Sequence, residues 1–298
     1  MLYRSIYIGN PAYLKLKDNQ MKILCPETKS EKGSVPVEDL GLLMLDHFQI
    51  TVSHQLIQRL MGNNVVVISC DAFHLPHGIM LPMHGHTEHS ARIKDQLEAS
   101  EPLKKQLWKQ TVECKIENQT EVLRRLGNYY EPMLDYKSNV KSGDVTNMEG
   151  IAAQHYWKYL ISLDFLRQRF GDSPNQFFNF GYSVLRSIVA RALVETGLLP
   201  VLGIFHKNKY NAYCLADDIM EPYRPFVDFM VMEWLKVYPE SEDLTKEFKA
   251  YMLNIATKDV RIDGVVRPLV VAVKSTSSSL YKCYTGEKRL ISYPQFRL

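Results

Sequence analysis

The first seventy residues alternate between short apolar runs and turn-forming residues. Residues 54–61 carry apolar side chains at helical intervals, and Gly62 follows as a helix stop. Around this short helix, extended runs bounded by Gly, Pro, Asn and Asp cover residues 3–8, 12–16, 21–24, 41–45 and 65–69. The pattern predicts a small β-rich domain over residues 1–73.

The pattern becomes irregular and then helical further along the chain. Residues 71–89 lose their periodicity and gain Pro and Gly, which favours an irregular connection, and we place a linker at residues 74–90. Apolar residues then recur every three or four positions over residues 91–107, 114–126, 146–170, 183–195, 212–237 and 244–253. We therefore expect an α+β protein whose larger domain, residues 91–298, is mainly α-helical.

Composition narrows the class of protein but does not identify a function. The chain has 298 residues, of which 46% are hydrophobic and 23% charged, as in ordinary globular proteins. Its 36 basic and 33 acidic residues give a net charge of +3, too small to indicate nucleic-acid binding by itself.

The location of the protein is predicted from its cysteines and its apolar segments. Five scattered cysteines do not form a disulfide framework and indicate a reducing compartment. The most apolar stretch, residues 183–205, contains Arg186, Arg191 and Glu195, so it favours a buried helix over a membrane span. Because the N-terminus shows no export signal, we expect a cytoplasmic protein that does not bind membranes.

Five histidines lie within sixteen residues, which raises the question of a metal site. Their spacing is irregular, and no cysteine or carboxylate completes a zinc pattern. An ordinary loop is the favoured interpretation for this group, which consists of His74, His77, His84, His86 and His89.

Glu149 lies near the start of a predicted helix and shares a face with apolar residues such as Ala152 and Tyr156. Its carboxylate is therefore expected to face inward. The alternative is a capping box, in which Glu149 reaches back to the backbone amide of Thr146. The local pattern alone favours the cap.

A second acidic group lies on one predicted helix face, where Asp217 and Asp218 precede Glu221 by four and three residues. A divalent metal would compensate these charges, and so would an ion-pair ladder formed by Glu221, Arg224 and Asp228. Pro222 and Pro225 predict a kink just after Glu221.

His206 follows a long apolar run and precedes two lysines. A single histidine in such a place is more often a surface or core residue than a ligand. Two carboxylates and one imidazole together, however, make a reasonable site for Mg²⁺ or Mn²⁺.

Four segments together resemble the CRISPR-associated spacer-acquisition integrases, the Cas-one family, and most closely their type II subgroup. The segments are EGIAAQHYW (149–157), NFGYSVL (179–185), GLLPVLGIFH (197–206) and DIMEPYRP (218–225). The similarity extends to ISCDAFHLP (68–76) and to residues 108–119, so it covers nearly the whole chain.

This resemblance implies a DNA integrase and endonuclease that joins captured DNA to the CRISPR repeat by attack of a 3′-hydroxyl on a phosphodiester. It assigns the ligands of Mg²⁺ or Mn²⁺ to Glu149, His206 and Glu221, with Asp218 as a candidate second acid. Many members have aspartate where this chain has Glu221, which is one methylene longer. The resemblance also implies a homodimer, a complex with the small Cas-two protein, contacts with other type II adaptation proteins, and double-stranded DNA as substrate.

Basic and polar residues near the expected ligands are candidates for holding DNA. Lys207, Lys209 and Arg224 are candidate phosphate contacts, and Asn179, Tyr182 and Arg186 are candidate supports for the site. A second basic set on predicted helices alternates with glutamates and equally fits a solvated face; it comprises Lys104, Lys105, Lys109, Lys115, Arg124 and Arg125.

Two other functions remain open from the sequence. One is a stand-alone metal-dependent nuclease acting on branched or linear DNA, with water in place of the 3′-hydroxyl. The other is a non-catalytic DNA-binding assembly subunit, in which Glu149 is a cap and the acids form ion pairs.

Overall fold

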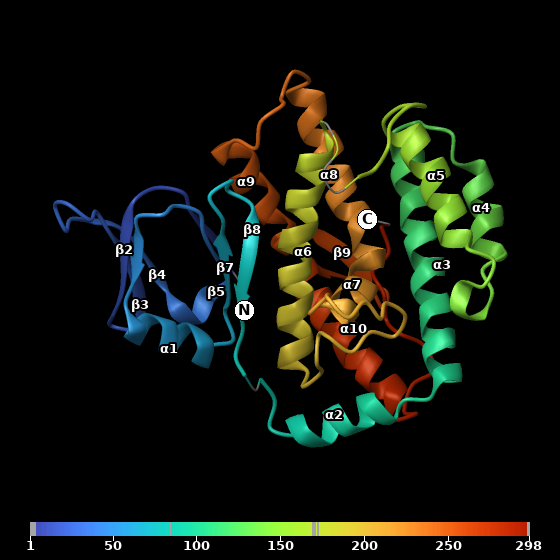
Figure 1. Cartoon of the computed structure of the whole chain (residues 1–298), viewed down its shortest axis with the longest axis horizontal. Helices are drawn as coiled ribbons and strands as arrows, with labels where there is room; N and C mark the ends of the chain where they lie inside the picture. The colour runs from blue at the N-terminus through green and yellow to red at the C-terminus, as the bar shows by residue number, and fades with distance from the viewer. Residues whose placement is uncertain (1–3, 84, 169–170, 172, 297–298) are drawn as a thin grey trace.

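The computed structural model describes residues 4–83, 85–168, 171 and 173–296. It has a β-rich N-terminal part and a larger helical part, which lie at the left and right of Figure 1. The predicted α+β class and its order along the chain are thus confirmed. None of the helices in the described ranges is long and apolar enough to cross a membrane.

Two four-stranded sheets make up the N-terminal part. The first has the order β1 (Arg4–Ile8), β5 (Leu40–Leu45), β7 (Val66–Cys70), β8 (Pro76–Met80), and the second the order β4 (Glu31–Pro36), β3 (Gln20–Leu24), β2 (Ala12–Lys17), β6 (Ile50–Val52). In the first sheet β1, β5 and β7 run parallel and β8 is antiparallel. Helix α1 (His54–Gly62) begins at a Ser53 cap, whose side chain accepts a hydrogen bond from the Leu56 amide.

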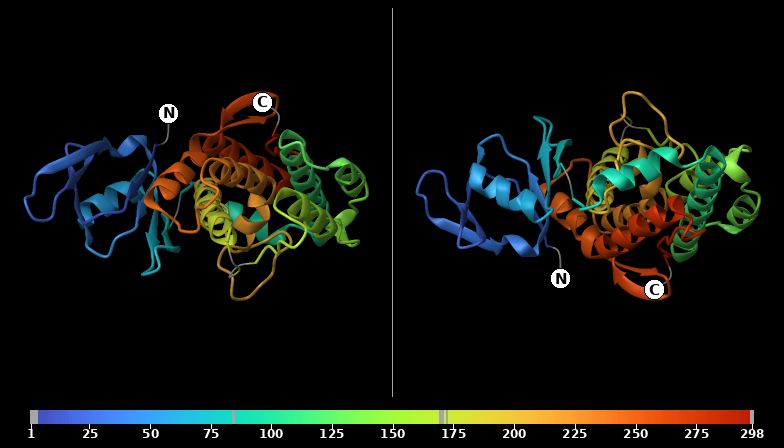
Figure 2. Two further views of the ribbon diagram at one scale, coloured as in Figure 1. Left: turned by 90° about the horizontal axis from the view of Figure 1, so that it is seen from above. Right: turned by 90° about the horizontal axis from the view of Figure 1, so that it is seen from below.

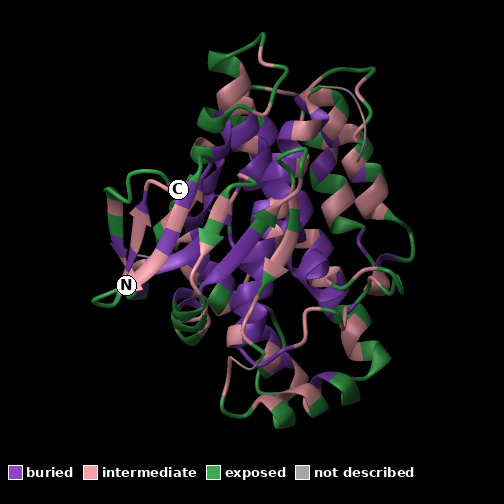
Figure 3. Ribbon diagram, turned by 60° about the vertical axis from the view of Figure 1, so that its left-hand side comes forward, coloured by how far each residue is buried: buried purple, intermediate pink, exposed green. Residues whose placement is uncertain are grey.

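The first sheet lies between two hydrophobic cores. Successive side chains of a strand point to opposite faces, so Leu42 and Ile68 join the core of the helical part, whereas Leu43 and Val67 join the smaller N-terminal core. Burial on both faces explains why β5 and β7 are continuous apolar runs. Figure 3 shows the buried residues gathered in the inner strands and in the helices packed against them.

Strand β8 corrects one sequence prediction. It forms within residues 71–89, for which the sequence favours an irregular connection. The strand is at the end of its sheet, and an edge strand tolerates a proline at its first residue, here Pro76. Strands β4 and β6 are also absent from the prediction. The domain boundaries themselves stay a prediction.

Helix α6 (Asn175–Glu195) runs through the middle of the helical part and is buried over most of its length (Figure 1). Around it are α2 (His89–Glu98), α3 (Glu101–Arg125), α4 (Glu131–Ser138), α5 (Met148–Leu160), α7 (Cys214–Met220), α8 (Arg224–Val237), α9 (Lys246–Leu253) and α10 (Leu269–Tyr284). A hairpin of β9 (Asp259–Ile262) and β10 (Val265–Pro268) lies near the C-terminus (Figure 2). Short 3₁₀ turns occupy Val37–Asp39, Ser142–Asp144, Glu221–Tyr223 (η3) and Asn254–Thr257.

Several predicted helices have different limits. Ser100 caps α3, and Pro102 lies in its first turn. A new helix therefore begins at residue 101, and it continues without interruption to Arg125. The helix expected over residues 146–170 ends at Leu160. The helix expected over residues 212–237 is divided into α7, η3 and α8, and the predicted kink after Glu221 is confirmed.

Candidate catalytic centre

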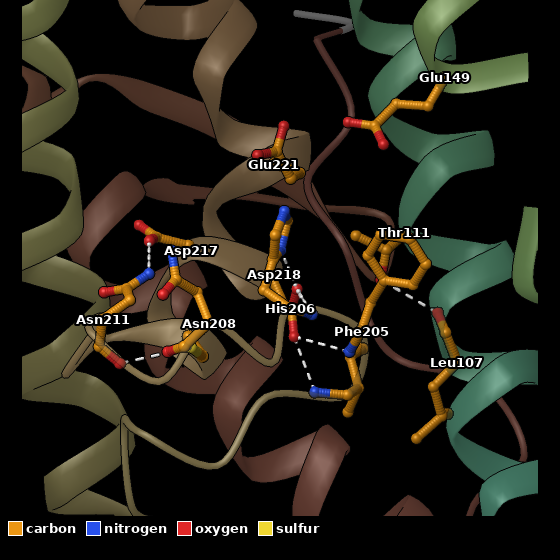
Figure 4. A network of polar contacts seen from close by, with 12 residues as sticks. Leu107, Thr111, Glu149, Phe205, His206, Asn208, Asn211, Asp217, Asp218 and Glu221 are labelled. Carbon is orange, nitrogen blue, oxygen red and sulfur yellow. Dashed lines mark hydrogen bonds and ion pairs between the residues drawn. The ribbon is translucent and has the colours of Figure 1, made fainter. Parts of the chain in front are cut away.

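Four parts of the helical region meet at one place: α3, the start of α5, the turn formed by α7 and η3, and the loop at residues 203–211. Figure 4 shows Glu149 extending toward Glu221 across this place, with His206 below Glu221. The three candidate metal ligands therefore lie in one neighbourhood, although they are far apart in sequence.

Glu149 is free to take part in the site because other residues cap its helix. Asp144 accepts hydrogen bonds from the Met148 and Glu149 amides at 2.8 and 3.0 Å, and Asn147 accepts one from the Gly150 amide at 3.3 Å. The capping box with Thr146 that the local pattern favours is therefore wrong. Instead, Oε1 of Glu149 lies 2.6 Å from Nζ of Lys115.

Glu221 is buried at the start of η3, with 4% of its surface exposed. Oε2 lies 2.6 Å from Nζ of Lys115, and Oε1 lies 2.9 Å from Nε of Arg224. Burial alone would raise the pKa of Glu221, but the charges of Arg224 and Lys115 outweigh it and lower the pKa. The ion pair between Glu221 and Arg224 that the sequence suggests is thus formed. Asp228, the third residue of the expected ladder, instead accepts hydrogen bonds from two tyrosines.

Lys115 links the two glutamates and is itself 9% exposed. Burial would lower the pKa of Lys115, but Glu221 and Glu149 raise it, so the side chain remains an ammonium ion. The sequence places Lys115 only among the lysines of a mixed basic and acidic helix. Its position between the carboxylates depends on how α3 packs against η3 and α5, which no local pattern reveals.

Asp218 holds the loop that carries His206. Oδ2 accepts hydrogen bonds from the amides of Ile204 and Phe205 at 2.7 and 3.0 Å, and Oδ1 accepts one from the amide of His206 at 3.2 Å. Oδ1 also lies 2.5 Å from Nδ1 of His206. Because both oxygens are engaged within the chain and the side chain is fully buried, the structure gives Asp218 a positioning role.

The hydrogen bond to Asp218 orients the imidazole of His206. In the neutral ring with Nδ1 donating to the carboxylate, Nε2 carries the lone pair, and the Nε2 end of the ring faces Glu221 (Figure 4). The same bond raises the pKa of His206, although burial opposes the shift. Phe205, stacked flat on Trp108 with ring centres 4.2 Å apart, supports the loop from the other side.

The predicted supporting residues contribute to networks around the site. The Tyr182 hydroxyl donates to Asp228 at 2.5 Å, and the guanidinium of Arg224 lies over the Tyr182 ring at 4.6 Å. Arg186 donates to Asp217 at 2.7 Å. Asn179 accepts a hydrogen bond from Arg167, also at 2.7 Å, and the guanidinium of Arg167 lies 5.1 Å from the centre of the Tyr182 ring.

The candidate DNA contacts divide into two groups. Arg224 is largely enclosed and paired with Glu221, so it belongs to the centre itself. Lys207 and Lys209 are exposed, and with Lys104 they line an open pocket of about 390 Å³ beside His206. Of the remaining basic set, Lys115 alone is buried.

A preformed metal centre is not visible in the described part of the chain. It contains no group of three or more His, Cys, Asp or Glu side chains close enough to hold a metal ion. Of the histidine group, His74 bonds to Asp46, His86 accepts from an amide, and His84 lies outside the described residues. The donor chemistry at Glu149, Glu221 and His206 nevertheless fits a cation, since the two carboxylates already share the ammonium of Lys115.

Comparisons with known proteins agree with this architecture. The chain is 33% identical over 281 residues to the CRISPR-associated endonuclease Cas1 of Neisseria meningitidis, covering 94% of this chain and 91% of that protein. A Pyrobaculum aerophilum relative of the same designation is 26% identical, covering 87% and 92%.

Solved structures share the fold. TM1797, a Cas1 protein from Thermotoga maritima, superposes with a TM-score of 0.79 at 18% identity, covering 97% of this chain and 99% of that one. A casposase bound to integration product superposes with a TM-score of 0.80 at 20% identity, covering 98% and 92%. The family model described as CRISPR associated protein Cas1 matches residues 6–262, and the chain therefore belongs to the Cas1 family.

Proposed function

We propose that this protein is a divalent-metal-dependent DNA integrase of CRISPR adaptation, which inserts captured DNA fragments, or spacers, into the repeat array. The relatives in Neisseria and Pyrobaculum are designated endonucleases, and the similar casposase is bound to an integration product. A further structure with this fold, at a TM-score of 0.73, is part of a Cas6-RT-Cas1–Cas2 complex. These likenesses support an integrase acting on DNA together with a Cas2 partner.

One observation carries the proposal for the chemistry. Glu149 and Glu221 are separated by 71 intervening positions in the sequence, yet their carboxylates meet at one cation, 2.6 Å from each, beside the ring of His206. Carboxylate and imidazole ligands suit Mn²⁺, and carboxylates suit Mg²⁺. We therefore assign Glu149, His206 and Glu221 as the residues that would hold the ion.

The proposed reaction is a transesterification. The 3′-hydroxyl oxygen of the captured DNA forms a bond to a phosphorus atom of the repeat. The bond between that phosphorus and the 3′ oxygen of the adjacent repeat nucleotide breaks. When bound, a divalent ion would stabilise the negative charge that develops on the phosphate and on the leaving oxygen. Asp218 keeps His206 oriented, and Arg224 keeps the carboxylate of Glu221 ionised.

The DNA backbone needs cations outside the centre. Lys104, Lys207 and Lys209 around the pocket beside His206 can neutralise phosphates without reading sequence. We extend the proposal to a homodimer, to contacts with other type II adaptation proteins and to a cytoplasmic location, in keeping with double-stranded DNA as substrate.

The nuclease alternative uses the same residues with water as nucleophile. The non-catalytic alternative loses one of its two premises, because Glu149 does not cap its helix. Joining and cutting can be separated in one assay, which incubates the protein and its Cas2 partner with linear donor DNA and a supercoiled repeat plasmid.

We expect metal-dependent joined products from the wild type and none from Glu149→Ala, His206→Ala or Glu221→Ala. Glu233→Ala, a change at a half-exposed glutamate on α8, should join normally. Cleavage without joining would favour the nuclease. Full joining by the three alanine variants, with folding confirmed, would contradict both catalytic readings.

A further inference from the structure

Lys115 has a more specific role than neutralising buried acids. We propose that its ammonium is a built-in counter-ion which a divalent metal must displace, so that this lysine couples metal binding to DNA binding. The inference rests on the proposed function, because it takes Glu149 and Glu221 as metal-holding residues.

The geometry makes the lysine and a metal ion competitors. Nζ of Lys115 lies 2.6 Å from Oε1 of Glu149 and 2.6 Å from Oε2 of Glu221, so these oxygens are at most about 5.2 Å apart. A divalent ion held by the same two carboxylates would need the space between them that the ammonium fills, since Mg²⁺ approaches its oxygen ligands to about 2.0–2.1 Å. Only one of the two cations can occupy it.

The charge balance at the centre also opposes a metal ion in the absence of DNA. Glu149 and Glu221, the two carboxylates that would hold the ion, face two cations, Lys115 and Arg224. These four side chains together carry no net charge. Adding a divalent ion would leave an excess of about two positive charges in a partly buried region, which is costly without nearby anions.

A DNA phosphate resolves both difficulties. It brings the negative charge that balances the metal, and it gives the displaced ammonium a new partner. Lys115 can make this change because its charge is on a flexible four-carbon stem, whereas Arg224 is held against both Glu221 and the ring of Tyr182. Metal bound without DNA would leave a desolvated ammonium unpaired.

The test is Mn²⁺ binding measured by titration calorimetry, with and without a short duplex whose 3′ ends lack the hydroxyl so that no joining occurs. For the wild type we expect the duplex to tighten Mn²⁺ binding about tenfold or more, which corresponds to about 1.4 kcal/mol. For Lys115→Met we expect binding without DNA to be about tenfold tighter than in the wild type, and the effect of DNA to shrink.

Lys109→Met is the matched control, because Lys109 is on the same helix and pairs with Glu113 away from the glutamates of the centre. It should bind Mn²⁺ as the wild type does. Should Lys115→Met fail to fold, Lys115→Arg keeps a charge at the position and should bind Mn²⁺ no more tightly than the wild type, with coupling to DNA retained.

Three outcomes would overturn the inference: unchanged or weaker Mn²⁺ binding by Lys115→Met, tighter binding by Lys115→Arg, or no effect of DNA on the wild type. A different result would count against the proposed function. If the wild type and Glu221→Ala bind Mn²⁺ equally well, or if neither binds it, then Glu221 does not hold a metal ion. The proposed metal site would then be wrong, independently of the role of Lys115.

Discussion

Asp218 accepts a hydrogen bond from Nδ1 of His206 at 2.5 Å, and it holds the backbone amides on both sides of Phe205 with the same carboxylate. One buried side chain therefore fixes both the path of the loop and the orientation of the imidazole. Under the proposed function His206 is a metal ligand, and the hydrogen-bond partners of such histidines contribute on the order of 10–100-fold to metal affinity or activity.

Asp218→Asn is expected to lower DNA joining and Mn²⁺ affinity by roughly 10–100-fold. The amide nitrogen of asparagine would donate to Nδ1 and place the proton of the neutral ring on Nε2, which removes the lone pair facing Glu221. Asp217→Asn is the matched control: it changes the adjacent carboxylate, which pairs with Arg186 and Asn211 instead. Equal effects of the two variants would contradict the orienting role.

Phe205→Leu should weaken joining more than it weakens the fold. Phe205 is 44% exposed, and its ring stacks on buried Trp108, a type of contact that contributes about 0.5–1.5 kcal/mol. Losing the stack loosens the residue before His206, and a shift of about 1 Å at a catalytic group can reduce the rate on the order of a hundredfold. Urea unfolding and joining assays on the same preparations test this; normal joining would show that Asp218 alone suffices to hold the loop.

Asp228 should make stability depend on pH in a way that an asparagine does not. Burial raises the pKa of Asp228 from 3.8 to about 6, against the hydrogen bonds from Tyr182 and Tyr156. Between these values the folded protein keeps a proton that the unfolded chain has lost, so stability falls as the pH rises. Two pH units of such a shift correspond to about 3 kcal/mol.

The measurement is the free energy of unfolding of the wild type minus that of Asp228→Asn, from pH 4 to pH 7. Because asparagine does not titrate, this difference isolates the carboxyl group. We expect this difference in the free energy of unfolding to decrease as the pH rises to about 6 and to stay constant above that pH. A difference independent of pH would mean that Asp228 ionises as easily as in the unfolded chain.

Sequence patterns predict the order of the two parts and the chemistry-bearing residues, but not how those residues meet. Glu149 stands out as an acid on an otherwise apolar helix face, and Glu221 stands out because it shares a predicted helix face with other acids. Lys115 does not, since its helix carries lysine and glutamate on most sides. Only the long-range packing of α3 on η3 and α5 makes it the shared partner of both glutamates.

Local rules failed where tertiary structure supplied a better alternative. Thr146 and Glu149 fit a capping box, yet Asp144 accepts the hydrogen bond from the Glu149 amide and Asn147 caps the helix one residue later. Helix α10 contains the run of hydroxyl residues 275–279, which has low helix propensity, but it forms because its apolar face is buried. Ser277 bonds to the carbonyl of Val273 within the helix, so its buried hydroxyl is satisfied.

A buried ion pair outside the candidate catalytic centre connects the two parts of the molecule. Nζ of Lys249 on α9 lies 2.8 Å from Oδ2 of Asp46, which follows β5, and also donates to the carbonyl of His74. The Tyr7 hydroxyl donates to the same carboxylate at 2.6 Å. Lys249 and Asp46 are only 3% and 2% exposed, so neither charge is well solvated.

Lys249→Met should therefore destabilise the protein by about 3–5 kcal/mol, because it leaves the charge of Asp46 buried without its cation. Adding Asp46→Asn should recover part of this loss, since the remaining group is neutral and can still bond to Tyr7. Chemical unfolding of the two single variants and the double variant measures the coupling. If the losses simply add, the pair does not join the β-rich part to α9, and the apolar contacts of the sheet with the helical core must hold the two parts together instead.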